Sequence, residues 1–98
     1  MKTVMVYQCE LDKEIEMEVY GKLKYIGKDF FLSLTNGKIY NCVGVDHGML
    51  RIVDDEGEDY LYPAKKPKPA DEQEYEGGQW EIVEIYNDDL RKELEMYG

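Results

Sequence analysis

The residues best suited to nucleophilic chemistry are two cysteines, Cys9 and Cys42, and the single histidine, His47. A histidine activates a cysteine thiol only when the two side chains lie within hydrogen-bonding distance. The cysteines lie far apart in the chain, and His47 falls in a predicted turn between Asp46 and Gly48. We therefore interpret His47 as a surface turn residue and the cysteines as reduced residues of strands, and we predict that the protein is not an enzyme. A cysteine–histidine pair assembled by folding is the alternative.

A cluster of carboxylates around Gly57 raises the question of calcium binding. An EF-type loop supplies ligands at alternate positions over about twelve residues and closes with a bidentate acid. The spacing here does not fit that frame, so we predict no metal site and no cofactor, and we interpret the cluster as a solvated hairpin tip. Its members are Asp54, Asp55, Glu56, Glu58 and Asp59.

Tyrosine is the most abundant aromatic residue, with nine copies in 98 residues. A tyrosine offers a large contact area with few rotatable bonds and a polar tip, which suits a protein interface. Packing in the outer layer of a small β-domain is the alternative interpretation. The residues predicted to bind a partner are Tyr25, Tyr60, Tyr62 and Trp80.

The net charge of −10 comes from 22 acidic and 12 basic residues. Such a field repels phosphate backbones and anionic lipid, so we expect no nucleic-acid or membrane partner. It also gives solubility and would attract a basic protein. The three lysines at 65–68 are interpreted as an offset to the acidic run that follows them, with binding of phosphate or of an acidic partner as the alternative. No apolar run approaches the ~18 residues of a membrane span, and the first residues turn polar too early for a signal peptide, so we predict a cytoplasmic protein.

The N-terminal residues 1–20 predict a β-hairpin. In its second half Ile15, Met17 and Val19 alternate with glutamates, which is typical of a half-buried strand. A helix over residues 10–20 is the rival, because glutamate, methionine and leucine favour helices. Whether this hairpin pairs within the chain or with a second copy is left open.

Residues 22–62 predict a strand, a long packed loop and two hairpins. The loop, at 27–36, is expected to be pinned by Phe30, Phe31, Leu32 or Leu34. Turn residues at 46–48 and 54–57 separate three further short strands, and glycine supplies the positive φ that tight turns require.

Three prolines interrupt the strands after Tyr62, and we predict a mobile loop at about 64–78. Apolar residues lie on both faces of the strand at 79–86, which predicts that it is covered on both sides or closes a barrel. A helix at 88–97 is expected to begin at Asn87 and to dock on the sheet, with a place under the N-terminal hairpin as one option. Its apolar stripe is Leu90, Leu94 and Tyr97.

This order of elements resembles the Src-homology-3-like small barrels. The chain looks like a family of uncharacterised small proteins of Gram-positive bacteria and their phages, a family without an established activity. The similar stretches are Lys24-Tyr25-Ile26-Gly27 and residues 34–40, 50–55, 57–63 and 80–84. The chain lacks the Ala-Leu-Tyr-Asp-Tyr motif and the paired tryptophan of the members that bind proline-rich peptides, so the resemblance does not imply that ligand.

We therefore predict one mainly β domain over residues 1–98. A five-stranded antiparallel Src-homology-3-like barrel spans 22–86, with an N-terminal hairpin extension at 1–20 and a short C-terminal helix at 88–97. The predicted function is a non-catalytic interaction module that binds another protein, or a second copy of itself, through a tyrosine-rich surface. The alternative is an acidic inhibitor or immunity-type protein that masks a basic surface of a toxin or nucleic-acid-binding protein.

Overall fold

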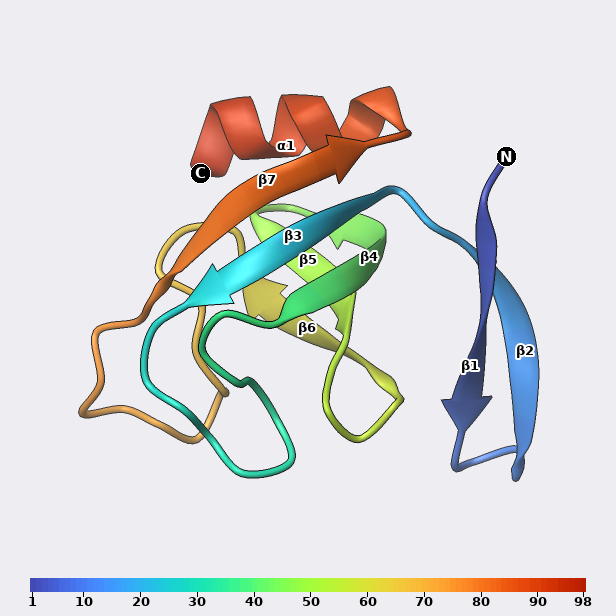
Figure 1. Cartoon of the computed structure of the whole chain (residues 1–98), viewed down its shortest axis with the longest axis horizontal. Coiled ribbons are helices and arrows are strands. Elements are labelled where there is room, and N and C mark those ends of the chain that lie inside the picture. Colours follow the sequence, from blue (N-terminus) through green and yellow to red (C-terminus); the bar gives the residue numbers. More distant parts are fainter.

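The chain folds into two antiparallel sheets and one helix, which we describe from a computed structural model covering residues 1–98. The strands β1 and β2 form a two-stranded sheet, and the other five form a sheet of order β6-β5-β4-β3-β7 (Figure 1). The prediction of a mainly β protein with a C-terminal helix is confirmed. The elements are β1 Thr3–Gln8, β2 Lys13–Glu18, β3 Gly21–Ile26, β4 Ile39–Asp46, β5 Met49–Val53, β6 Asp59–Pro63, β7 Gln79–Ile85 and α1 Asp88–Tyr97.

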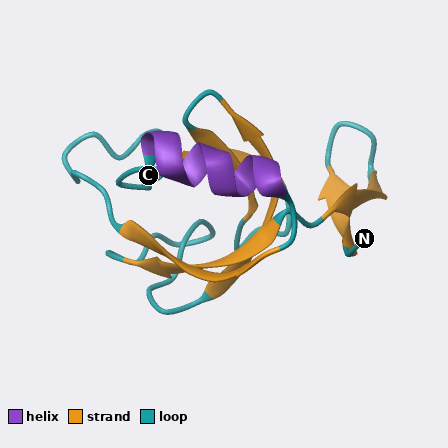
Figure 2. Cartoon of the chain, turned by 90° about the horizontal axis from the view of Figure 1, so that it is seen from above, coloured by secondary structure: helices purple, strands orange, loops and turns teal.

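The main sheet builds its core from alternate residues of each strand. On β3 the buried residues are Gly21, Leu23 and Tyr25, while the lysines between them point the other way, because successive side chains of a strand face opposite sides. Two register shifts, beside Leu23 and between Cys42 and Gly44, interrupt the ladders. Such bulges bend strands, and the sheet curls around its interior with α1 along one side (Figure 2).

The sheet does not close, so the predicted barrel is wrong in this respect. β6 and β7 are the two edges of the sheet and do not pair with each other. A single hydrogen bond spans this seam, from the indole Nε1 of Trp80 to the carbonyl oxygen of Pro63 at 3.1 Å. The expectation that β7 is covered on both sides is also wrong, because Ile82 and Val83 are 57% and 42% exposed.

The core joins the sheet to the loop after β3 and to the helix. Leu34 of that loop is fully buried and Phe30 is half-buried. A tight turn from Phe30 to Leu34 leaves Phe31 92% exposed and holds Leu32 at a positive φ of 60°. The predicted packed loop is therefore pinned by Leu34 and not by Phe31. The main cluster consists of Leu23, Tyr25, Leu34, Tyr40, Cys42, Leu50, Ile52, Tyr62, Ala64 and Leu90.

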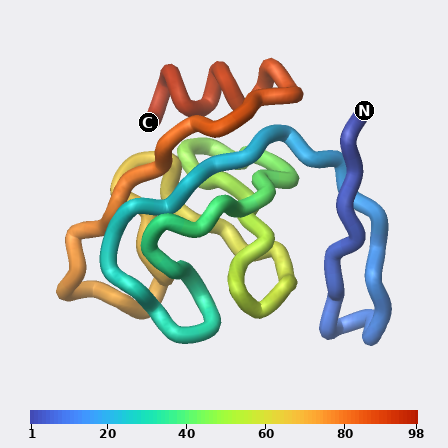
Figure 3. Tube along the Cα trace, in the orientation of Figure 1, coloured from blue at the N-terminus to red at the C-terminus, as the bar shows by residue number.

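The N-terminal hairpin forms a separate sheet beside the main one (Figure 3). Residues 13–18 are a strand paired with β1 in the same chain, so the helical alternative is wrong. Val6 is fully buried on the inner face. At the tip, the side chain of Gln8 donates to Asp59 at 2.6 Å, and the amide of Cys9 donates to Glu58 at 3.0 Å. The hairpin is thus attached at its tip as well as through the chain.

The helix α1 begins where the sequence predicts. The side chain of Asn87 accepts a hydrogen bond from the amide of Asp89 at 2.8 Å, which caps the first turn. Leu90 packs on Gly21, where an added Cβ would lie 2.6 Å from Leu90 Cδ2. The helix contacts β7, β4 and the turn after β4, so it does not lie under the N-terminal hairpin. It is too short and polar to cross a membrane.

The segment between β6 and β7 is packed onto the rest of the fold at several points. Ala64, Pro67 and Pro69 are buried. The amide of Gly78 donates to the carbonyl of Pro67 at 2.9 Å, and Lys68 Nζ donates to the carbonyl of Tyr75 at 2.8 Å. These contacts fix the course of the chain between the two edge strands.

Candidate functional site

Two of the four residues predicted to bind a partner belong to the core. Tyr25 is fully buried and Tyr62 is 4% exposed. The Tyr25 hydroxyl donates to the carbonyl of Lys28, and the Tyr62 hydroxyl donates to Asp54 Oδ2, both at 2.7 Å. Both rings belong to the main hydrophobic cluster of the domain. The prediction that they form a surface patch is therefore wrong.

The other two residues, Tyr60 and Trp80, do not share a surface either. Tyr60 is 44% exposed on the edge strand β6, where its hydroxyl donates to Glu58 at 3.0 Å. Trp80 is half-buried and lines a different hollow. Of the predicted set, only Trp80 lies in the groove described next.

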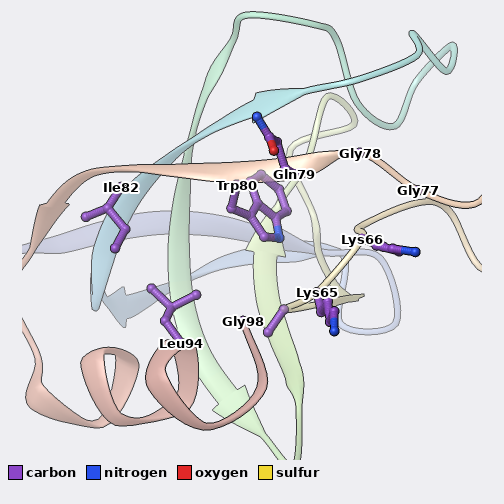
Figure 4. A pocket seen from close by; sticks show the side chains of 10 residues that line it. Lys65, Lys66, Gly77, Gly78, Gln79, Trp80, Ile82, Leu94 and Gly98 are labelled. Carbon is purple, nitrogen blue, oxygen red and sulfur yellow. The ribbon is translucent and has the colours of Figure 1, made fainter.

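This groove lies between β7, α1 and the start of the segment after β6, and we call it the β7–α1 groove. Its volume is about 450 Å³. In Figure 4 the side chains of Trp80 and Ile82 point from β7 toward Leu94 on α1, and Lys65 and Lys66 lie near one end. The lining residues are Ala64, Lys65, Lys66, Gly77, Gly78, Gln79, Trp80, Ile82, Leu94 and Gly98.

The core holds Trp80 in one orientation. Its ring meets Tyr25 edge to face at 5.9 Å between centroids and Tyr40 at 6.3 Å. Its only hydrogen-bond donor is used by Pro63 across the seam. The ring therefore presents a fixed apolar surface to the groove, with no donor left for a ligand.

The groove runs along an unpaired sheet edge. β7 pairs only with β3, so no strand covers its other side. Edge strands offer unpaired backbone groups to an extended chain. Ile82, 57% exposed in the same strand, adds apolar surface. This combination suits recognition of a peptide segment.

Two lysines give the groove a cationic end. Lys65 and Lys66 are exposed, and neither takes part in any of the five ion pairs of the chain. The neighbouring Ala64 and Pro67 are buried, and Lys66 has a φ of 54°. The sequence interpretation treated these lysines as an offset to the acidic run at 71–76, but no ion pair joins the two segments.

The residues considered for nucleophilic chemistry are not brought together. Cys9 lies in the exposed turn after β1, and Cys42 is buried, which raises its pKa to about 11. His47 lies in the turn after β4, as predicted, with Nδ1 2.8 Å from Asp46 Oδ1. No hydrogen bond joins His47 to either cysteine. No group of three or more histidine, cysteine or acidic side chains is arranged to hold a metal ion.

The carboxylates around Gly57 are bonded to the fold more than the prediction of a solvated tip allows. Asp54 accepts hydrogen bonds from the Tyr62 hydroxyl and from the amide of Glu56. Asp55 accepts from Thr35, Lys38 and Tyr40. Asp59 pairs with Arg51 and with Gln8. These carboxylates connect the turn to the loop after β3, to the strands of the main sheet and to the N-terminal hairpin.

Asp54 and Asp55 are expected to change stability with pH in opposite directions. Burial raises the pKa of Asp54. At Asp55 burial also acts to raise the pKa. The hydrogen bonds that this carboxyl accepts outweigh burial, so its pKa is lowered. The folded state therefore binds the Asp54 proton more tightly than the unfolded chain does, and gains stability as pH falls through the raised pKa. The stabilisation by ionised Asp55 is present above the unfolded value and is lost as pH falls through the lowered pKa.

Urea unfolding of the wild type, Asp54→Asn and Asp55→Asn between pH 7 and pH 3 tests these signs. Between pH 7 and about pH 4, near the ordinary value of an aspartate, the wild type should gain stability relative to Asp54→Asn. Below that pH it should lose stability relative to Asp55→Asn. Parallel curves for all three proteins would contradict the assignment.

The chain was compared with protein families, curated proteins and solved structures. No protein-family model, no curated protein and no solved structure matches the chain.

Proposed function

We propose that the protein is a cytoplasmic, non-catalytic interaction module that binds a segment of another protein in the β7–α1 groove. The observation that carries the proposal is an apolar groove beside an unpaired strand edge, with Trp80 fixed in its wall. The volume of about 450 Å³ is within the range of roughly 300–1,000 Å³ typical of ligand sites. We also propose that the main sheet is an open relative of the Src-homology-3-like barrels; the β6-β5-β4-β3-β7 strand order supports this.

The preorganisation of the groove supports binding over a purely structural role for its residues. Trp80 is locked by two aromatic neighbours and one hydrogen bond, so it loses little freedom when a ligand arrives. Aromatic anchors held in this way often dominate the energy of protein interfaces. Ile82 stays 57% exposed after folding, and an occupied groove would remove more of its apolar surface from water.

The test uses two substitutions in the same strand. A random 12-residue peptide library is selected on the immobilised full chain, and the affinity of the selected peptides is measured through the emission of Trp80, the only tryptophan. Ile82→Asp should weaken binding at least tenfold, because it places a charge in the apolar part of the groove. Val83→Asp is the matched control, since Val83 is exposed in β7 but does not line the groove. Failure to select any peptide, or equal sensitivity to both changes, would overturn the proposal.

The acidic inhibitor is a second candidate, and the exposed carboxylates of the N-terminal hairpin favour it. Glu14 and Glu16 are exposed on β2 in a protein of net charge −10. A basic partner would be steered to such a surface, and its binding would weaken with salt. In that case Ile82→Asp would leave binding unchanged, whereas Glu14→Lys together with Glu16→Lys would weaken it.

A further inference from the structure

We infer that the occupant of the β7–α1 groove is an extended acidic peptide segment with one apolar anchor residue. This inference rests on the proposed function and specifies the partner of the same groove. It is supported by the charges that line the groove, by the fixed backbone that carries the two lysines and by the apolar wall beside them.

The charge of the groove is opposite to the charge of the whole protein. Two lysines and no acidic side chain line it, although the chain has 22 acidic residues and only 12 basic ones. At physiological salt, charges farther away than about 8 Å are largely screened. A bound ligand therefore senses Lys65 and Lys66, which line the groove, more strongly than the carboxylates that lie beyond this distance. The groove is a site for an anionic group on a protein that would otherwise repel one.

The fold fixes the backbone beneath these two lysines. Ala64 and Pro67 are buried on either side of them. The amide of Gly78 holds the carbonyl of Pro67, and Gly77 lies so close to Lys66 that a Cβ would overlap the Lys66 carbonyl group. A fixed backbone lowers the entropy lost when the lysines contact a ligand.

The apolar wall sets the form of the ligand. Trp80 and Ile82 are two residues apart on one strand, which separates them by about 7 Å. The lysines lie toward the Trp80 end and Leu94 lies across from Ile82 (Figure 4). An extended ligand with its anchor side chain between Ile82 and Leu94 would bring a carboxylate about two or three residues away to the lysines.

The experiment compares peptides selected on three proteins. The random 12-residue library is selected on the full wild-type chain and on Lys65→Glu/Lys66→Glu, with Lys13→Glu/Lys28→Glu as a control of equal charge change. Peptides selected on the wild type and on the control should be enriched in aspartate or glutamate two or three residues from an aliphatic or aromatic residue. Their affinity for Lys65→Glu/Lys66→Glu should fall about tenfold, and it should fall with salt for the wild type.

The outcomes separate this inference from the proposed function. Peptides that require Ile82 but are neutral or basic, and that bind Lys65→Glu/Lys66→Glu equally well, would overturn the acidic ligand and keep the binding module. The absence of any peptide that depends on Ile82 would overturn both. A dimer detected by light scattering and abolished by Ile82→Asp would make a second copy the occupant and would overturn the acidic peptide.

Discussion

Replacing Leu90 by alanine is expected to lower the free energy of unfolding by about 2–5 kcal/mol, the usual cost of truncating a buried leucine. Leu90 is the only fully buried residue of α1, and it packs on Gly21 at the start of β3. A helix of ten residues is marginal on its own. Loss of this contact should therefore free the helix and remove one wall of the β7–α1 groove.

Urea unfolding and hydrogen exchange of the α1 amides measure this effect. The matched control is Met96→Ala, because Met96 is 72% exposed on the same helix. Its effect should stay within about 0.5 kcal/mol. If Leu90→Ala and Met96→Ala behaved alike, the helix would not depend on its packing against Gly21.

Replacing Gly77 by alanine should lower stability by about 2–6 kcal/mol. Gly77 has a φ of 124°, and a Cβ there would overlap the carbonyl group of Lys66. Strained backbone costs about 1–3 kcal/mol, and overpacking adds a similar amount. The same change should move Lys65 and Lys66 and weaken the binding of selected acidic peptides.

Gly57→Ala separates the two contributions to the Gly77 effect. Gly57 also has a positive φ, of 84°, but an added Cβ would meet no atom within 4 Å. Its substitution should cost only the backbone strain, about 1–2 kcal/mol. Thermal unfolding of both variants and peptide titration of the folded proteins make the comparison. Equal losses at the two positions would mean that the close approach to Lys66 does not matter.

Local patterns predicted most of the elements correctly. The alternation of Ile15 and Met17 with glutamates identifies β2, and the turn residues at 46–48 and 54–57 identify the hairpins of the main sheet. Asn87 marks the start of α1. These signals act over a few residues and depend little on the rest of the fold.

The closure of the sheet and the exposure of the tyrosines depend on distant contacts. Tyr60 and Tyr62 lie two residues apart on the same face of β6, yet their exposures are 44% and 4%. They differ because β6 is an edge strand and only Tyr62 has its hydroxyl bound to buried Asp54. The alternation of residues along a strand predicts on which face a side chain lies, but it does not predict whether other residues cover that face. The burial of Tyr25 is predictable from the sequence, because Tyr25 shares a face of β3 with Leu23.

The groove could be predicted only in part. Trp80 was selected from the sequence for its type, and apolar residues on both faces of β7 indicated an unusual strand. The sequence predicts that Leu94 docks the helix on the sheet and that Lys65 and Lys66 offset the acidic run, with an acidic partner as the alternative. These residues come together in the groove because of the path that residues 64–78 take, and the local sequence does not specify that path.

Phe31 is a large aromatic residue that takes almost no part in the packing of the fold. Its side chain is 92% exposed at the turn between Phe30 and Leu34, close to its exposure in the unfolded chain. Folding therefore gains almost nothing from this ring, and its replacement by a polar residue should change the free energy of unfolding by less than about 0.5 kcal/mol. Any requirement for an aromatic group at this position arises between molecules, after the chain has reached its native form.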